Sequence, residues 1–337
     1  MKKSSLIMAS LFALTAFSGG LTTTLATAAE KIVLKYSVVF PPNGAQGEGA
    51  KQMEKFIEEF SDGKIDFQFY PSAQLGDKLQ SLEGLRNGSI EMSEASAADL
   101  GNYSKLWSIF SMPFLFNSGA DAIRVITDPR VASILNKDAE AQGFKIIGWW
   151  NLGERSVINS VRPVMKPEDL KGIKIRVMQN PVLAKAITAM GATGIPMAWS
   201  EVYTAVQQKT IDGLENSPPV IASNKMYEVA KYYSMTQQFI IPDPQMISVK
   251  VYNALSPDLQ AAVVKAGKAS QEDFNAKWEK AMTSQMMFLK ENGVKVNEVD
   301  KEAFRAAVKP MVDEFLSSAS PATKKLYDAI VLVRDGG

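Results

Sequence analysis

Strand-like and helix-like segments alternate along this chain, and this alternation constrains its fold more than any other feature. Three segments rich in β-branched and aromatic residues are strand-like: residues 32–40, 64–70 and 144–150. The helical stretch after the first of them has apolar residues at helical spacing: Met53, Phe56, Ile57 and Phe60. Strands that alternate with helices are typical of an α/β fold with a largely parallel sheet, which we therefore predict. We expect the glycine-rich stretch 41–49 to be a loop.

A second series of such segments begins near Leu152. Its strand-like and helix-like parts are residues 154–160, 172–177, 181–191, 194–199, 200–210 and 211–216. The chain has 337 residues, which is enough to bury two cores. Residues 237–251 resemble a strand that links the two series, and no long Pro/Gly-rich linker separates them. We therefore expect the chain to cross between the two halves more than once.

One later segment permits an unusually long helix. After Pro257 no proline occurs before Gly293, and Gly267 alone interrupts good helix formers. A helix of about 36 residues would be roughly 54 Å long. Because this length exceeds the diameter of either half, we expect the helix to span both, either straight or kinked at Gly267.

The first 28 residues have the pattern of a secretory signal peptide. Lys2 and Lys3 precede an apolar run at 6–17, and small residues lead to Ala28, near which we expect cleavage. The mature protein is therefore predicted to be exported. The chain has 37 basic and 36 acidic residues, so nothing in its charge favours nucleic acid.

Histidine and cysteine are both absent from the sequence. Nucleophile systems that need histidine, histidine general bases and histidine metal sites are therefore ruled out. The glycines at 44–49 lack the spacing of a dinucleotide loop, and no Walker lysine follows them. We predict no cofactor and no metal, and we expect a binding protein rather than an enzyme.

The segment "DLKGIKIRVMQNP", residues 169–181, directs a charged side chain from the end of a strand. Apolar residues alternate through this strand, so Arg176 points to the face opposite them. A helix then begins, with Asn180 as its N-cap and Pro181 in its first position. Ligands of open α/β sheets bind outside the carboxyl ends of strands, and a guanidinium matches the two oxygens of a carboxylate. The segment therefore predicts a carboxylate site at Arg176; the alternative is an edge-strand arginine whose head meets water.

Longer blocks of the sequence resemble the DctP-type solute-binding proteins of tripartite ATP-independent periplasmic (TRAP) transporters. The central block is "PEDLKGIKIRVMQNP", followed by "GATGIPMAWSEVYTAVQQKTIDGLEN". "PSAQLGDKLQSLEGLRNGSIEMS", "GERSVINSVRPV" and the long late helix agree with it, so the resemblance spans almost the whole mature chain. It implies a periplasmic-binding-protein-like fold with two α/β domains around a central ligand cleft. The domains are expected at 29–151 with 242–280, and at 152–241 with 281–337.

The resemblance also implies which residues contact the ligand. Arg176 corresponds to the family's main carboxylate ligand, and Arg155 and Asn216 correspond to residues that assist it. The other implied contacts are Gln179, Trp199, Ser96 and Glu94. The alternative for Arg155 is a surface ion pair with Glu154 or Asp169.

Two adjacent tryptophans, Trp149 and Trp150, face opposite sides of their strand. One of them belongs to the core, and we expect Trp150 to form a wall of the cleft on which a sugar face could stack. Glu215 is expected to be a structural partner rather than a ligand contact.

These features together predict a periplasmic solute-binding receptor of a TRAP transporter. We expect it to be a monomer that captures a small organic acid, with a sugar acid such as a hexuronate or an aldonate favoured. It would deliver the acid to the small and large membrane subunits of a permease. The alternatives are a C4-dicarboxylate or an aromatic or keto acid as ligand, a periplasmic sensor component, and an exported carboxylate-acting lyase.

Overall fold

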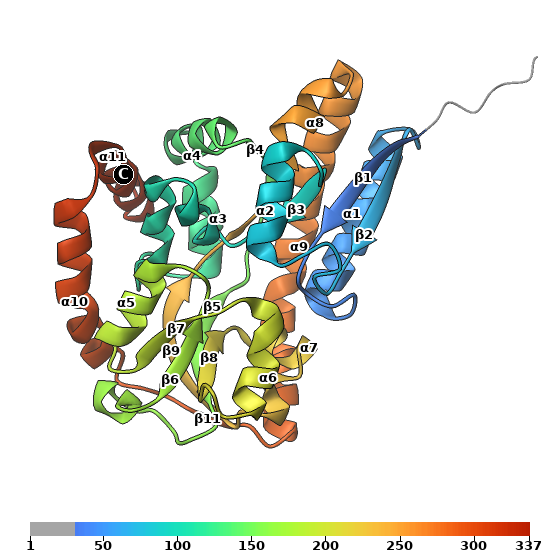
Figure 1. Cartoon of the computed structure of the whole chain (residues 1–337). Helices are drawn as coiled ribbons and strands as arrows, with labels where there is room; N and C mark the ends of the chain where they lie inside the picture. The colour runs from blue at the N-terminus through green and yellow to red at the C-terminus, as the bar shows by residue number, and fades with distance from the viewer. Residues whose placement is uncertain (1–30) are drawn as a thin grey trace, which may run out of the picture. The chain divides into compact units, whose positions relative to one another are not determined.

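The computed structural model describes residues 31–337, which form two β-sheets with helices packed around them (Figure 1). This arrangement confirms the predicted α/β class. The predicted signal peptide and its cleavage site near Ala28 lie outside the described residues. Within residues 31–337, no helix combines the length and the apolar character that a membrane crossing requires.

The first sheet has the strand order β2–β1–β3–β10–β4. Its strands are β1 (Ile32–Ser37), β2 (Ile65–Tyr70), β3 (Met92–Glu94), β4 (Phe144–Trp150) and β10 (Asp243–Ser248). Strand β1 pairs in parallel with β2 and β3, whereas β10 runs antiparallel to both β3 and β4. The sheet is therefore parallel except for the strand that arrives from later in the chain.

The second sheet has the order β11–β9–β5–β8–β6–β7. Its strands are β5 (Glu154–Asn159), β6 (Lys174–Val177), β7 (Thr193–Pro196), β8 (Gly213–Asn216), β9 (Tyr232–Ile240) and β11 (Lys295–Asn297). Strand β5 is antiparallel to both of its neighbours, while β6 runs parallel to β7 and β8. Each sheet is thus largely parallel, as predicted.

Two of the chain's passages between the sheets are short connections. Residues 151–153 join β4 to β5, and residues 241–242 join β9 to β10. The segment 237–251, expected to be one linking strand, is therefore divided between the two sheets. Pro242 lies at the division, where its missing N–H removes no hydrogen bond from either sheet.

Helices of the first half are α1 (Gly44–Phe60), α2 (Lys78–Asn87), α3 (Gly119–Thr127) and α4 (Pro129–Ala141). The expectation of a loop throughout 41–49 is wrong, because α1 begins at Gly44. Tertiary packing overrides the low helix propensity of glycine here. A Cβ atom on Gly47 would lie 2.3 Å from the carbonyl oxygen of Pro42, and one on Gly49 would lie 2.6 Å from the Phe274 ring.

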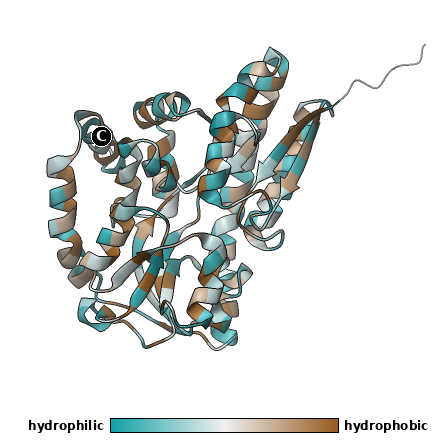
Figure 2. Cartoon of the chain, viewed as in Figure 1, coloured by the Kyte–Doolittle hydropathy of each residue, from teal (hydrophilic) through white to brown (hydrophobic). Residues whose placement is uncertain are grey.

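Helices of the second half are α5 (Pro181–Ala189), α6 (Val202–Gln207) and α7 (Pro218–Ser223). The predicted start of α5 is confirmed, since the Asn180 side chain accepts hydrogen bonds from the backbone N–H groups of Val182 and Leu183. Brown apolar positions and teal polar positions are interleaved along the helices in Figure 2, as expected of helices that bury one face.

The long helix is α9 (Pro257–Glu291), which follows α8 (Val249–Ala254). Phe274 and Trp278 of α9 pack in the hydrophobic cluster of the first sheet, and Leu289 packs in a cluster of the second. Helix α9 thus runs past both sheets, as predicted (Figure 1). It continues through Gly267, where a Cβ atom would lie 2.3 Å from the carbonyl oxygen of Ile147 in β4. The glycine therefore lets the helix approach the strand closely.

The chain ends with α10 (Lys301–Ser318) and α11 (Pro321–Arg334). Helix α10 packs against α5, and α11 packs against α3 and α4. The last two helices therefore connect elements that surround different sheets.

Candidate functional site

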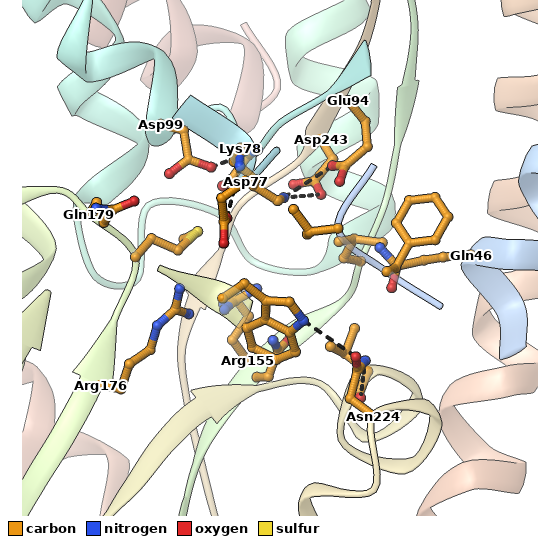
Figure 3. Close-up of a pocket in the computed structure, with 18 residues that line it drawn as sticks. Gln46, Asp77, Lys78, Glu94, Asp99, Arg155, Arg176, Gln179, Asn224 and Asp243 are labelled. Carbon is orange, nitrogen blue, oxygen red and sulfur yellow. Dashed lines mark hydrogen bonds and ion pairs between the residues drawn. The ribbon is translucent and has the colours of Figure 1, made fainter. Parts of the chain in front are cut away.

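The candidate site is a pocket between the carboxyl ends of strands from both sheets (Figure 3). Strands β1 and β3 approach it from the first sheet, and β6 and β8 from the second. Its empty space, including the opening to solvent, is about 580 Å³. It is lined by Val39, Phe40, Gln46, Asp77, Lys78, Glu94, Ser96, Asp99, Leu152, Arg155, Arg176, Met178, Gln179, Trp199, Asn216, Val220, Asn224 and Asp243. Ligand sites of α/β proteins occur at this edge of a sheet.

Arg176 is held rigidly on the second-sheet side of this pocket. Its neighbours in β6, Ile175 and Val177, are fully buried in the core, so the alternation of the strand directs the guanidinium to the other face. Nε and Nη2 donate to the carbonyl oxygen of Met197, at 2.9 and 2.7 Å. The guanidinium carbon lies 5.3 Å from the centroid of the Trp199 ring. These contacts fix the orientation of the head group.

The charge of Arg176 lacks a direct acidic partner. The residue is 3% exposed, and no carboxylate within residues 31–337 forms an ion pair with it. Burial, together with the nearby Arg155, lowers its pKa from the ordinary 12.5 to about 10, although more distant carboxylates act in the opposite direction. Arg176 is therefore a buried cation whose desolvation is poorly compensated.

Arg155 is also buried, but it is paired. Its Nε donates to Oε2 of Glu215 at 2.6 Å, and Nη2 donates to Oε1 and to the backbone oxygen of the same residue, each at 3.0 Å. Burial alone would lower the pKa of Arg155, but Glu215 more than offsets this effect and raises it. The alternative of a surface ion pair with Glu154 or Asp169 is therefore wrong. Glu215 is a structural partner, as expected.

A second group of charges faces the two arginines across the pocket (Figure 3). We call Lys78, Glu94, Asp99 and Asp243 the acidic wall. Lys78 Nζ lies 3.1 Å from Glu94 Oε2 and 3.6 Å from Asp243 Oδ2. Asp99 Oδ2 accepts a hydrogen bond from the backbone N–H of Ser96 at 3.1 Å.

Burial perturbs the titration of this acidic wall. It raises the pKa of Asp99, and it raises the pKa of Asp243 well above its ordinary value, with Glu94 adding to the effect. Burial would lower the pKa of Lys78, but its carboxylate neighbours raise it instead. The amine therefore stays protonated among the carboxylates.

The structure brings seven of the eight residues expected from the sequence to the lining of this pocket. They are Arg176, Arg155, Asn216, Gln179, Trp199, Ser96 and Glu94. The expectation for Trp150 is wrong. It is fully buried, stacks on Phe274 with ring centroids 4.2 Å apart, and donates its Nε1 hydrogen to Ser270. Trp149 is buried as well, against Trp107, because helices cover both faces of β4.

Sequence reasoning missed most of the acidic wall. Lys78 and Asp99 belong to short polar stretches without a motif, and Asp243 is the first residue of β10, inside the segment 237–251 that was expected to be one strand. Asp77 had one local signal, since it starts a capping box with Gln80, but that pattern predicts a helix start and no ligand contact. The residues of the acidic wall meet only because four separate segments converge.

Four hydrogen bonds cross the pocket region from one sheet's side to the other, and one of them runs from Asn102 Nδ2 to the backbone oxygen of Gln179 at 3.1 Å. Asp77 Oδ2 accepts from the hydroxyl and the backbone N–H of Ser200, at 2.7 and 3.2 Å. Asn180 Nδ2 donates to the carbonyl oxygen of Ala98 at 2.7 Å. Burial would raise the pKa of Asp77, but the hydrogen bonds from Ser200 and Lys78 lower it. The carboxylate of Asp77 therefore stays ionised and connects the two sides of the pocket through Ser200. We call this pair of hydrogen bonds between Asp77 and Ser200 the clasp.

Comparison with known proteins agrees with this geometry. The family model described as bacterial extracellular solute-binding protein, family 7, matches residues 36–318. The 2,3-diketo-L-gulonate-binding periplasmic protein of Escherichia coli is 31% identical over 301 residues, which cover 88% of this chain and 90% of that protein.

Two solved structures are similar to nearly the whole described chain. A TRAP periplasmic solute-binding protein from Sulfitobacter sp. NAS-14.1 with bound β-D-galacturonate has a TM-score of 0.84 and 31% identity, covering 90% of this chain and 100% of that chain. The sugar acid binding protein of Advenella mimigardefordensis in complex with galactonate has a TM-score of 0.85 and 27% identity, covering 90% and 98%. The chain therefore belongs to family 7 of the bacterial extracellular solute-binding proteins, the periplasmic receptors of TRAP transporters.

Proposed function

We propose that this receptor captures a sugar acid, either a hexuronate or an aldonate, and delivers it to the small and large membrane subunits of its permease. Proteins of this family are transport receptors for small acids rather than enzymes. The ligand carboxylate docks on Arg176, and Arg155 and Asn216 assist it. Gln179, Trp199, Ser96 and Glu94 contact the rest of the ligand.

The unpaired charge of Arg176 carries this proposal. A buried cation costs several kcal/mol unless an anion and further hydrogen bonds compensate it. Nη1 of Arg176 forms no hydrogen bond within residues 31–337, whereas Nε and Nη2 are held by Met197. A carboxylate in the pocket supplies the missing anion, in a charge-assisted hydrogen bond to an already oriented donor.

The remaining lining suits a hydroxylated ligand. Trp199 offers an aromatic surface beside the arginine, and the hydroxyl of Ser96 is buried without a hydrogen-bond partner. A sugar hydroxyl can donate a hydrogen bond to a carboxylate, and it can accept one from a hydroxyl such as that of Ser96. The sugar acids named for the similar proteins from Sulfitobacter and Advenella are of this class.

We propose further that the two halves close around the ligand. Contacts from both sheets are available together only in the closed form, so the ligand shifts the equilibrium towards closure. The domain division 29–151 with 242–280 and 152–241 with 281–337 belongs to this proposal, as do the monomeric state and cleavage near Ala28. Residues 151–153 and 241–242 would serve as hinges.

A thermal-shift screen tests the ligand class and the arginine together. D-glucuronate, D-galacturonate, D-galactonate and D-gluconate are compared with non-sugar acids on the purified mature protein. A ligand at 100 times its Kd adds about 2.7 kcal/mol to the free energy of unfolding. We expect at least one sugar acid to raise Tm, and we expect Arg176→Met to abolish that rise.

Arg162→Met is the matched control. Arg162 likewise donates to backbone oxygens, those of Asp169 and Lys171, but it does not line the pocket. Its substitution should leave the ligand-induced rise in Tm intact. A rise that persists in Arg176→Met would refute the arginine's role, and a screen in which no sugar acid binds would refute the ligand class.

A further inference from the structure

The acidic wall contains a cation, Lys78, in the position where a second carboxylate of a dicarboxylic acid would need one. A basic residue facing Arg176 would by itself favour dicarboxylates. The charge of Lys78 is already committed, however, because Glu94 lies 3.1 Å and Asp243 3.6 Å from its amine. Asp99 adds a third carboxylate to the same wall. Even with one proton shared among these acids, the wall carries no surplus positive charge.

The acidic wall and the adjacent Ser96 present buried polar atoms without hydrogen-bond partners. Within residues 31–337, Glu94 Oε1 and the hydroxyl oxygen of Ser96 form no hydrogen bond, and Asp243 Oδ2 has only the Lys78 amine at 3.6 Å, beyond hydrogen-bond distance. All three residues line the pocket and are at most 2% exposed. Buried polar atoms are normally paired, so these atoms point to ligand groups that supply hydrogen.

We infer that the acidic wall selects acids with a single carboxylate and a hydroxylated far end, and that it rejects dicarboxylates. This inference rests on the proposed function, since it places the ligand carboxylate at Arg176. A hydroxyl at the far end donates to Glu94 or Asp243. A carboxylate there would face acceptors of its own charge.

The discrimination follows from like-charge repulsion in a buried site. Juxtaposing like charges at an interface costs several kcal/mol, which corresponds to about 100-fold or more in Kd. Glu94 and Asp243 would therefore determine specificity, while Arg176 determines affinity for acids in general. Neutralising either carboxylate releases Lys78 to bind a second carboxylate of the ligand.

Matched acids test this inference by isothermal titration calorimetry. D-galactonate and galactarate, like D-gluconate and D-glucarate, differ only in whether the last carbon is an alcohol or a carboxylate. D-galacturonate and D-glucuronate are included as ring-forming acids with one carboxylate. We expect the best monocarboxylate to bind wild-type protein about 100-fold more tightly than its matching aldarate.

Asp243→Asn and Glu94→Gln should each reduce this ratio about tenfold, and aldarates should bind these variants more tightly than wild type. Glu83→Gln is the control: it removes one charge from the exposed face of α2 and should leave the ratio unchanged. Urea unfolding monitors the fold of each variant.

Equal binding of aldarates and monocarboxylates by wild type would overturn the inference while leaving the proposed sugar-acid function in place. An unchanged ratio in both variants, or a fall caused only by weaker monocarboxylate binding, would overturn it too. If none of the monocarboxylates binds, the proposed function itself fails.

Discussion

Substituting methionine for either buried arginine of the pocket should have different effects on stability in the absence of ligand. Arg155→Met removes the partner of Glu215, a carboxylate with no exposed surface that receives two hydrogen bonds from this arginine. Removing one member of a buried ion pair costs about 3–5 kcal/mol. In a protein of this size, that loss lowers Tm by roughly 5–8 °C.

The substitution Arg176→Met has two opposing effects on the free energy of unfolding. The displacement of its pKa from 12.5 to about 10 corresponds to about 3 kcal/mol that burial of the charge costs at neutral pH. The substitution removes this cost, but it leaves the carbonyl oxygen of Met197 without two hydrogen bonds, a loss of about 1–3 kcal/mol. The free energy of unfolding should therefore stay the same or rise, by no more than about 2 kcal/mol.

Urea unfolding at pH 7 without ligand, followed by circular dichroism, measures both effects. The double variant Arg155→Met/Glu215→Met is the control, because replacing a whole buried pair by apolar residues is often neutral. It should recover most of the stability lost in Arg155→Met. Equal losses in the two single variants, or no recovery in the double variant, would show that the electrostatic reasoning is wrong.

Two further predictions concern the clasp and the long helix. Asp77→Asn keeps a competent N-cap on α2 but weakens the hydrogen bonds from Ser200, so bound ligand should dissociate about fivefold faster in stopped-flow fluorescence, as in Ser200→Ala. Because the pKa of Asp77 is lowered in the folded state, its carboxylate holds the hydrogen bonds from Ser200 above about pH 4 and loses them as it is protonated at lower pH. A wild-type dissociation rate that does not change as the pH falls through this range would contradict the role of Asp77. Gly267→Ala should lower the free energy of unfolding by about 1–3 kcal/mol, since the new methyl group meets the carbonyl oxygen of Ile147, whereas an unobstructed helix would gain about 1 kcal/mol. Urea unfolding of Gly267→Ala distinguishes the expected loss of stability from the gain that an unobstructed helix would show.

Local patterns in the sequence were sufficient for much of the fold. The strand at 174–177 and the capped start of α5 follow from side-chain alternation and from the chemistry of Asn180. The direction of Arg176 follows from the same alternation. These features depend on backbone geometry over a few residues, which is why they can be read without knowing what lies opposite.

The long helix shows where such patterns reach their limit. Its length was predictable from the absence of proline, but the role of Gly267 was not. A glycine in a helix can indicate a kink or a close contact, and the choice depends on β4, which lies more than 100 residues earlier in the chain.

Trp150 and Arg155 show the same limit in the pocket. Alternation places Trp149 and Trp150 on opposite faces of β4, yet it does not reveal that helices bury both faces. The partner of Arg155 is Glu215, 60 residues away on a neighbouring strand. The acidic wall likewise gathers residues from α2, β3, β10 and the turn that contains Asp99. The periodicity of the sequence determines the direction of each side chain. Its partners are determined by the order of the strands and by the elements packed over them, because these contacts join segments that are distant along the chain.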